Sequence, residues 1–414
     1  IAIGGSTNSS VAWPHGANVT SPAALFLTVH GSSVDLLNAD GTTAGGDVPT
    51  VSVDMVRRQF TVMLPHTAFN PTGQVVRLAM GVGLWDTANN KYLLPGTIAS
   101  ATAPGGAGLA AAPAAFFNLA FRSNSQEPFP DIAGLANAGT AVVLNPAWWR
   151  DSAQGAALAS GDISGFFANV DFDKLASGVN DDMPDLPGGV PQSGPMDRIL
   201  ASHFETAQGL DFSKMCSSSA GCIGEYLGRL QPYAIYVPKG PPPPGGWGLT
   251  LLLHSLSANY NQFASSHNQS EFATRGLGSI VITAEARGPD GWYYEYAGAD
   301  VFEMWADAAS RFPLNPADTA IAGYSMGGYA TYKFATQFPD LFGKAQPTVG
   351  PPGLGVWVPP APPEPGGTQS NTNAMLASLR NIPFLSWDGA EDELGPVLGA
   401  QTQAATGCTL WCRH

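Results

Sequence analysis

The chain has 414 residues with 18 Lys and Arg against 32 Asp and Glu, so its formal net charge is −14, and charged residues make up only 12%. Nucleic-acid binding depends on clustered Lys and Arg that neutralise phosphates, and no window of this sequence concentrates them, so a nucleic-acid partner is not expected. The 44% hydrophobic and 10% aromatic content is enough for a full core and argues against wholesale disorder. At this length we expect two domains, or one large domain with an appendage.

No apolar run approaches the roughly 20 residues that a helix needs to cross a bilayer. The longest candidate, Leu249–Leu253, has the length of a short buried strand. We therefore expect no membrane span. The chain begins at Ile1 rather than Met, which indicates a mature form or a fragment from which any signal peptide has gone.

The four Cys fall in two close pairs, Cys216 with Cys222 and Cys408 with Cys412. Neither pair has the C-x-x-C spacing or the nearby His that is typical of a zinc site, so no metal is expected. Disulfides in an oxidising compartment are favoured over free buried thiols, and with the low charge they favour a secreted, extracellular protein.

Residues 1–125 carry period-two patterns and turn residues, with little that indicates helix. Phe60, Val62 and Leu64 alternate with other residues, and two further strand-like runs cover Val75–Trp85 and Phe116–Phe121. This region is predicted to be a β-sandwich-like accessory domain.

Residues 126–222 are rich in Pro, Asp, Gly and Ser, and the apolar stretches around Ala156–Phe167 and Ile199–Leu210 suggest short helices. We predict a connecting, partly helical segment that packs on the region C-terminal to it; a plain linker is the alternative.

From residue 223 to residue 414 strands alternate with helices, which predicts an α/β domain with a doubly wound, mostly parallel sheet. The predicted strands are Tyr233–Val237, Leu249–Leu253, Ser279–Ala284, Thr319–Gly323 and Pro383–Trp387. The predicted helices are Asp300–Phe312, Gly328–Phe338 and Asn373–Arg380.

The most informative motif is Gly323-Tyr324-Ser325-Met326-Gly327, a G-x-S-x-G pattern with a predicted strand before it and a predicted helix after it. That context holds a serine hydroxyl up at the end of a sheet, so Ser325 is the candidate nucleophile. The two glycines are needed because the sharp turn leaves no room for side chains. An ordinary Ser in a glycine-rich turn is the competing interpretation.

A serine nucleophile also needs fixed donors for the oxyanion that it forms. The N–H of Met326 follows the nucleophile directly at the helix start. The run Leu249–Leu256 is an apolar strand that ends in His254 and a small residue, so the N–H of Leu256 is the predicted second donor. His254 itself is expected to shape the loop rather than to transfer protons.

Three acids compete to orient the catalytic base in the segment after the strand Pro383–Trp387. Asp392 lies where the loop should curl over the sheet and is the preferred candidate, Glu393 is expected to be a solvated neighbour, and Asp388 is expected to be a structural turn residue.

In the Ser, Asp, His chain order of this architecture the base follows the acid, and the only His beyond Asp392 is His414, the last residue. Either His414 is the base, held by a Cys408–Cys412 bridge, or the chain stops before its true base loop and the catalytic domain is incomplete at its C-terminus.

Several motifs together resemble secreted α/β-hydrolases, closest to the branch of prolyl-oligopeptidase-like and polyhydroxyalkanoate-depolymerase-like esterases. The motifs are Tyr233–Pro238, Leu249–Phe263, Arg287–Trp292, Gly323–Phe342 and Ala390–Leu394, which lie within residues 223–400. The resemblance implies that Ser325 is the nucleophile and Asp392 the acid. The sequence departs from the family at Ser255, where Gly is common, and in lacking a recognisable C-terminal His loop.

The expected function is therefore that of a secreted serine esterase that cleaves carboxylic esters, either small or polymer-linked, through an acyl-enzyme and without a cofactor. The same groups would serve a prolyl-oligopeptidase-type peptidase, and a catalytically dead surface-binding protein is the third possibility. The sequence does not decide the oligomeric state.

Overall fold

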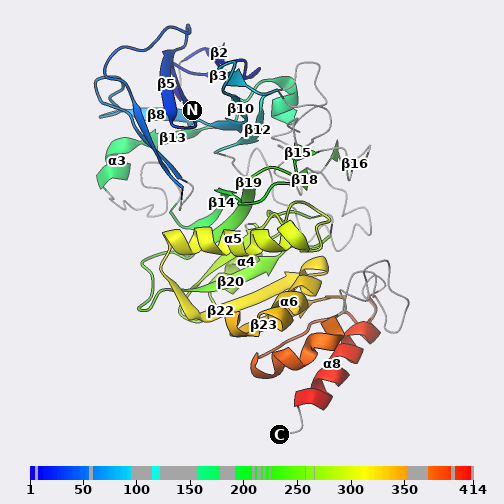
Figure 1. The fold of residues 1–414 in the computed structure, drawn as a ribbon. Helices are drawn as coiled ribbons and strands as arrows, with labels where there is room; N and C mark the ends of the chain where they lie inside the picture. Colours follow the sequence, from blue (N-terminus) through cyan, green and yellow to red (C-terminus); the bar gives the residue numbers. More distant parts are fainter. Residues whose placement is uncertain are drawn as a thin grey trace. The chain divides into compact units, whose positions relative to one another are not determined.

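The computed structural model describes fourteen segments of the chain: residues 1–4, 8–55, 59–94, 114–121, 156–177, 192–207, 210–211, 216–217, 221–222, 225–256, 258–264, 266–351, 372–392 and 397–411. The chain forms two compact units (Figure 1). The first comprises Ile1–Gln192 and Leu200–Gln231, and the second comprises Ser193–Ile199 and Pro232–His414.

The first unit is built on a five-stranded sheet in the order β13-β8-β1-β4-β5, and all four of its strand pairings are antiparallel. Its strands are β1 (Ala2–Gly4), β4 (Leu25–His30), β5 (Ser33–Asn38), β8 (Val75–Ala79) and β13 (Ala168–Asp171). Two-stranded sheets pair β2 (Ser10–Ala12) with β3 (Thr20–Pro22), β6 (Thr50–Asp54) with β7 (Gln59–Met63), β9 (Gly81–Gly83) with β12 (Phe116–Leu119), and β10 (Trp85–Asp86) with β11 (Lys91–Tyr92).

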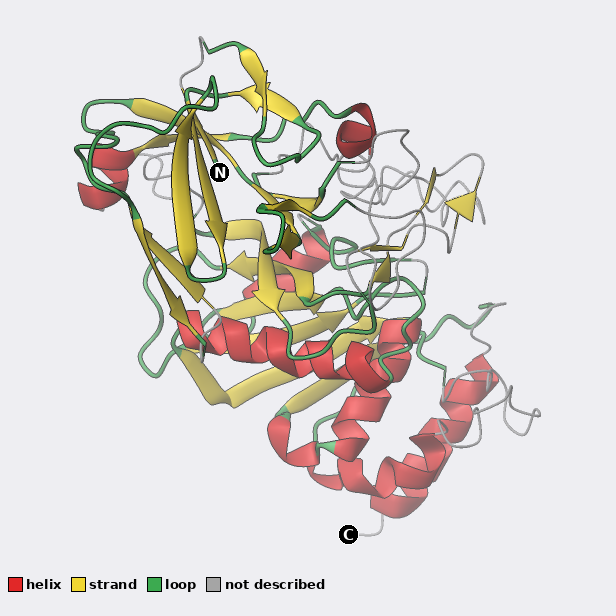
Figure 2. Ribbon diagram, turned by 45° about the horizontal axis from the view of Figure 1, so that its top comes forward, coloured by secondary structure: helices red, strands yellow, loops and turns green. Residues whose placement is uncertain are grey.

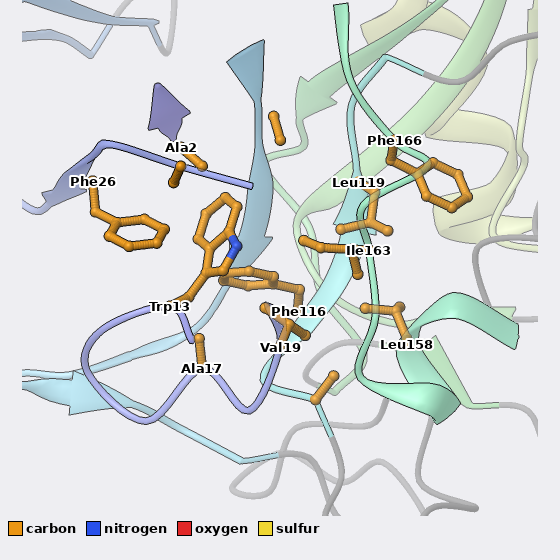
Figure 3. Close-up of a cluster of buried hydrophobic side chains, with 13 residues drawn as sticks. Ala2, Trp13, Ala17, Val19, Phe26, Phe116, Leu119, Leu158, Ile163 and Phe166 are labelled. Atoms are coloured by element: carbon orange, nitrogen blue, oxygen red, sulfur yellow. The ribbon is translucent and has the colours of Figure 1, made fainter. Parts of the chain in front are cut away.

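This sheet has apolar side chains on both faces. Successive strand residues point to opposite sides, so neighbouring apolar residues of one strand pack into different clusters. In β4, Phe26 belongs to one buried cluster and Leu27 to another. Figure 3 shows the first cluster, in which the Trp13 ring lies 5.4 Å from Phe26 and 5.1 Å from Phe116. Side chains from small two-stranded sheets contribute to the two clusters.

The β-sandwich-like prediction for residues 1–125 is therefore not confirmed. The strands predicted around Val62 and Phe116 exist, as β7 and β12. The period-two signal identifies strands but not their partners, and Phe60 in the alternating run is 53% exposed.

Residues between 126 and 222 contribute to both units. A short helix covers 156–160, β13 pairs with β8, and α3 (Phe172–Ser177) follows β13. The predicted helix over Ile199–Leu210 is wrong: β14 (Gly194–Ala201) continues into it and lies beside β19. Sheet pairing outweighs the local helical preference of this run.

The second unit contains a six-stranded mixed sheet in the order β14-β19-β21-β20-β22-β23. Its remaining strands are β19 (Leu230–Val237), β20 (Trp247–Leu253), β21 (Ser279–Ala284), β22 (Leu314–Tyr324) and β23 (Lys344–Thr348). The pairings β20–β21, β20–β22 and β22–β23 are parallel, whereas β19 runs antiparallel to β21. An α/β unit with parallel strands is thus confirmed.

The order of these strands places a topological switch next to β20. From β20 the chain passes through α4 (His267–Ala273) to β21 on one side, and α5 (Glu295–Arg311) then returns it to β22 on the other side. From β22 it continues through α6 (Met326–Gln337) to β23. The connections after β20 and β22 therefore diverge, and ligands of open α/β sheets bind where strand connections diverge in this way.

Helices cover both faces of the sheet, and Figure 2 shows helices packed against its strands. Ala273 of α4 packs with Leu252, Val281 and Ala322 on one face. On the other face a Cβ at Gly323 would lie 2.3 Å from the Gly327 carbonyl oxygen of α6. The rings of Phe302 in α5 and Phe334 in α6 are 5.6 Å apart, so these two helices pack against each other.

The C-terminal part of the described chain is helical. The 3-10 helix η5 (Thr372–Asn381) and α8 (Val397–Trp411) flank a segment in which Phe384 and Trp387 form parallel bridges to Ala345 and Thr348 of β23. No helix of the described part combines the length and the apolar character that a membrane span requires.

Arg275, just after α4, ties three strands together at the amino end of the sheet. Its guanidinium contacts the Asp318 carboxylate of β22. It also donates to the Leu249 carbonyl and the Thr250 hydroxyl of β20 at 2.9 and 3.2 Å, and to the Ser279 hydroxyl of β21 at 3.1 Å. The Arg275 side chain is 15% exposed, so solvent screens these contacts only partly.

We expect Arg275→Met to lower the free energy of unfolding by about 2–3 kcal/mol, because it leaves Asp318 and a strand carbonyl without their buried partner. Urea denaturation measures the change. Lys344→Ala is the matched control: Lys344 lies 3.8 Å from the same carboxylate but is 55% exposed, so its loss should cost less than about 0.5 kcal/mol. Equal effects of the two substitutions would contradict this assignment.

Candidate active site

Ser325 occupies a strained turn between β22 and α6. Its backbone has φ 54° and ψ −112°, a conformation that residues with a Cβ rarely adopt. The turn is held because the Ser325 N–H donates to the Thr348 carbonyl at 2.9 Å and the Tyr329 N–H donates to the Ser325 carbonyl at 2.9 Å. A strained, half-buried serine at the carboxyl end of a parallel strand matches the geometry of a nucleophile elbow.

Three glycines make this turn possible. A Cβ at Gly327 would lie 2.0 Å from the Leu253 carbonyl oxygen, and one at Gly328 would lie 2.7 Å from the Thr348 carbonyl oxygen. Since backbone atoms cannot move aside cheaply, only glycine fits at these positions. The steric need predicted for Gly323 and Gly327 is confirmed, and it extends to Gly328.

The same close approach brings the elbow against the loop that follows β20, residues 254–264, here called the β20 loop. A Cβ at Gly327 would also lie 2.8 Å from the His254 carbonyl oxygen. The two predicted oxyanion donors thus sit on adjoining segments: Met326 begins α6, and Leu256 is the third residue of the β20 loop.

Both predicted donor amides are unoccupied among the described residues: neither the Met326 nor the Leu256 N–H has a hydrogen-bond acceptor there. The first N–H groups of any helix lack an intrahelical acceptor, which explains Met326. Leu256 is 37% exposed, whereas the N–H of the preceding residue, Ser255, donates to the Gln262 side chain at 2.7 Å. Free, fixed N–H groups beside a serine are what an oxyanion requires.

His254, the first residue of the β20 loop, is fully buried. Its Nδ1 is 2.9 Å from the Ser255 carbonyl oxygen and its Nε2 is 3.0 Å from the Glu285 carbonyl oxygen. Burial lowers the pKa of this imidazole. With both ring nitrogens against backbone carbonyls, His254 supports the loop and has no free nitrogen to accept a proton from Ser325.

The acid candidates lie at the same edge of the sheet. Thr348, which accepts the Ser325 N–H, is bridged to Trp387, and Asp388 follows Trp387 directly. The Ser386 hydroxyl donates to Asp388 at 2.5 Å, and burial raises the pKa of Asp388. Its hydrogen bond to Ser386 is consistent with the turn role expected from the sequence.

Asp392 is half-buried, and its N–H donates to the Gly389 carbonyl at 3.4 Å, in the segment that directly follows the bridge from Trp387 to Thr348. Burial raises the pKa of Tyr324, the residue before the nucleophile, and the charge of Asp392 raises it further. Asp392 also adds to the raised pKa of Asp388. The structure therefore brings Ser325, Met326, Leu256 and Asp392 to one edge of the sheet. Glu393, Cys412 and His414 lie outside the described residues.

Two residues that sequence reasoning did not select belong to this edge. Gln262 binds Ser255 in the β20 loop. Tyr293, fully buried, donates its hydroxyl to the His254 carbonyl at 3.1 Å. The only sequence signal was the run of polar residues Asn259–Gln262 directly after an apolar strand, where solvent-exposed loop residues would be the ordinary expectation.

No cluster of three or more His, Cys, Asp or Glu side chains suited to a metal ion occurs within the described segments.

Neither a protein-family model nor a curated protein matches this chain. Solved structures are similar over part of it. A thermostable esterase is 18% identical with a TM-score of 0.35, over 47% of this chain and 50% of that one. S-formylglutathione hydrolase from Staphylococcus aureus is 18% identical with a TM-score of 0.34, over 53% and 87%. Acylaminoacyl peptidase from Pyrococcus horikoshii is 13% identical with a TM-score of 0.35, over 44% and 33%.

The chain thus spans half the length of the esterase and a third of the peptidase. At such low identities and TM-scores these neighbours carry no argument about its activity.

We expect Ser325→Gly to be about 1 kcal/mol more stable than Ser325→Ala, because glycine relieves a strain of about 1–3 kcal/mol and loses roughly 0.5–1 kcal/mol through its freer unfolded chain. Both variants lack the hydroxyl, so the comparison isolates the backbone. Urea midpoints of the two proteins give the difference, and a less stable Ser325→Gly would show that the turn is unstrained.

Proposed function

We propose that this chain is a serine hydrolase of the α/β-hydrolase type that cleaves carboxylic esters through an acyl-enzyme at Ser325. The observation that carries the proposal is the strained backbone of Ser325 at the strand-to-helix turn, against which the β20 loop is packed. Strain of this kind persists only where the surrounding structure imposes it, and it is typical of functional positions.

In the proposed reaction the Ser325 Oγ attacks the acyl carbon while a histidine removes the hydroxyl proton. The negative charge that develops on the carbonyl oxygen is stabilised by the N–H groups of Met326 and Leu256. Collapse of the tetrahedral intermediate breaks the bond to the alcohol, which leaves with the proton from the histidine. Water then attacks the acyl-enzyme by the reverse proton path, releases the acid and restores the Ser325 hydroxyl.

Asp392 is proposed to orient the histidine, since it follows the bridge from Trp387 to Thr348, and the Thr348 carbonyl accepts the Ser325 N–H. His414 is the proposed base because it is the one histidine of the given sequence that comes after Asp392. No cofactor is needed for this chemistry, and the uncharged ester substrate is either small or part of a polymer.

Fluorophosphonate labelling tests the proposal. We expect covalent modification of the protein at Ser325, identified by peptide mass spectrometry, together with turnover of p-nitrophenyl acetate. Ser325→Ala should abolish both, since the attacking oxygen is gone. A protein that remains unlabelled would instead be the surface-binding scaffold without catalysis, and an amide with the same acyl group distinguishes an esterase from a peptidase.

Two carboxylate variants serve as the matched control in the same assay. Asp392→Asn should lower kcat by about 10⁴-fold, as expected for loss of the group that orients the base. Asp388→Asn keeps an acceptor for the Ser386 hydroxyl and should stay within about tenfold of the parent. The opposite ranking would assign the acid to Asp388.

We further propose that the protein is secreted and that Cys216 and Cys222 form a disulfide. The backbone register of β16 (Cys216–Ser217) and β17 (Gly221–Cys222) sets these residues directly opposite each other. Opposed residues of antiparallel strands have Cα atoms about 4.5–5.5 Å apart, within the range of about 4.4–6.8 Å that a disulfide needs. Peptide mapping without reduction should recover the linked pair from secreted protein; two alkylated cysteines would refute it.

A further inference from the structure

We propose that Gln262 is a positioning residue that holds the peptide between Ser255 and Leu256 in the orientation needed to bind the oxyanion. The inference rests on the proposed ester hydrolysis. It concerns a side chain that would itself touch neither substrate nor nucleophile.

Both ends of the Gln262 carboxamide bind the same residue. Its Oε1 accepts the Ser255 N–H at 2.7 Å, and its Nε2 donates to the Ser255 Oγ at 3.0 Å. Gln262 is 8% exposed and Ser255 is 7% exposed. Water cannot readily replace either bond at such burial, so loss of the carboxamide would leave the Ser255 N–H unsatisfied.

The carbonyl of Ser255 is held from the other side. It lies 2.9 Å from the His254 Nδ1 and accepts the Ala258 N–H at 3.1 Å. The N–H, the hydroxyl and the carbonyl of Ser255 are thus all engaged within the molecule, and four contacts fix the position of this residue.

Fixing the Ser255 carbonyl also fixes the Leu256 N–H, because the two belong to one peptide unit. A trans peptide is planar, and its N–H points opposite to its C=O. Since the Ser255 C=O points toward the His254 ring and the Ala258 amide, the Leu256 N–H must point away from them. It has no acceptor among the described residues, and Leu256 is 37% exposed.

The preceding peptide is anchored as well, which extends the support toward the elbow. The Tyr293 hydroxyl donates to the His254 carbonyl at 3.1 Å. The same carbonyl oxygen packs closely against Gly327. Pre-organised donors stabilise a developing oxyanion because they need no reorientation during the reaction. Gln262 would supply that pre-organisation by accepting the Ser255 N–H, while the next N–H, that of Leu256, has no acceptor within the described segments.

The test compares the full chain with Gln262→Met, which keeps the length but removes both polar ends, and with Gln262→Glu, which keeps an acceptor for the Ser255 N–H. For Gln262→Met we expect kcat for p-nitrophenyl acetate to fall about 100-fold with KM within about threefold. Amide hydrogen exchange over residues 254–264 should be faster than in the parent. Gln262→Glu should restore kcat to within about tenfold and slow the exchange again.

Gln337→Met is the control for the substitution itself, because Gln337 is exposed at the end of α6; its kcat and exchange should equal those of the parent. An unchanged kcat in Gln262→Met overturns the inference. So does a fall in kcat with unchanged exchange, since the effect would not pass through the β20 loop.

If the proposed hydrolysis is wrong, the parent protein will neither turn over the ester nor react with fluorophosphonate. The exchange measurement then still decides whether Gln262 holds the loop, and unchanged exchange refutes it. If Gln262→Met does not fold, Gln262→Glu carries the test: a loss of kcat beyond about tenfold with parent-like exchange overturns the inference.

Discussion

The contact between two backbones, Gly327 of α6 against the Leu253 carbonyl at the end of β20, is the constraint on which the candidate site depends. With the would-be Cβ only 2.0 Å from that oxygen, no other residue fits there. The helix can therefore begin directly beside the strand end, and the chain can reach it from β22 only through a sharp turn. The strained φ of Ser325 and the closeness of the β20 loop both follow from this contact.

The order of strands explains why that contact occurs at β20. The chain leaves β20 toward α4 on one face and leaves β22 toward α6 on the other, so the two adjacent strand ends are not covered by a common connection. Backbone amides can then face the gap from both sides. In the β20 loop the Gln262 carboxamide satisfies the N–H and the hydroxyl of Ser255, while the Leu256 N–H has no acceptor among the described residues.

The sequence predicted the α/β unit, its parallel strands and the position of Ser325, because a strand, a glycine-bounded serine and a helix follow one another locally. Asp392 was predicted as the acid because it lies in the segment after a predicted strand, and its charge acts on Tyr324 in the structure. Partners distant in the chain could not be read in this way. The Gln262 side chain holds Ser255, which lies seven residues earlier in the chain. Strand β14 forms because it pairs with β19, although its C-terminal residues belong to a run that predicted a helix.

The first unit shows the same limit on a larger scale. Alternation around Phe60 and Val62 identified a strand, yet only the sheet order shows that it lies outside the five-stranded sheet and that both faces of that sheet are apolar. Local patterns describe one strand at a time, whereas the choice of neighbours depends on the packing of the whole unit.

Arg275 contacts Asp318 of β22, and Asp318 lies seven residues before the strained Ser325 that follows this strand. At about 3.3 Å per residue this separates them by roughly 20 Å, well beyond the distance of about 7–10 Å within which substitutions usually couple. Thermal robustness and reactivity can consequently evolve apart in this fold. Substitutions around Arg275 that raise the free energy of unfolding would allow the protein to stay folded with destabilising substitutions near Ser325.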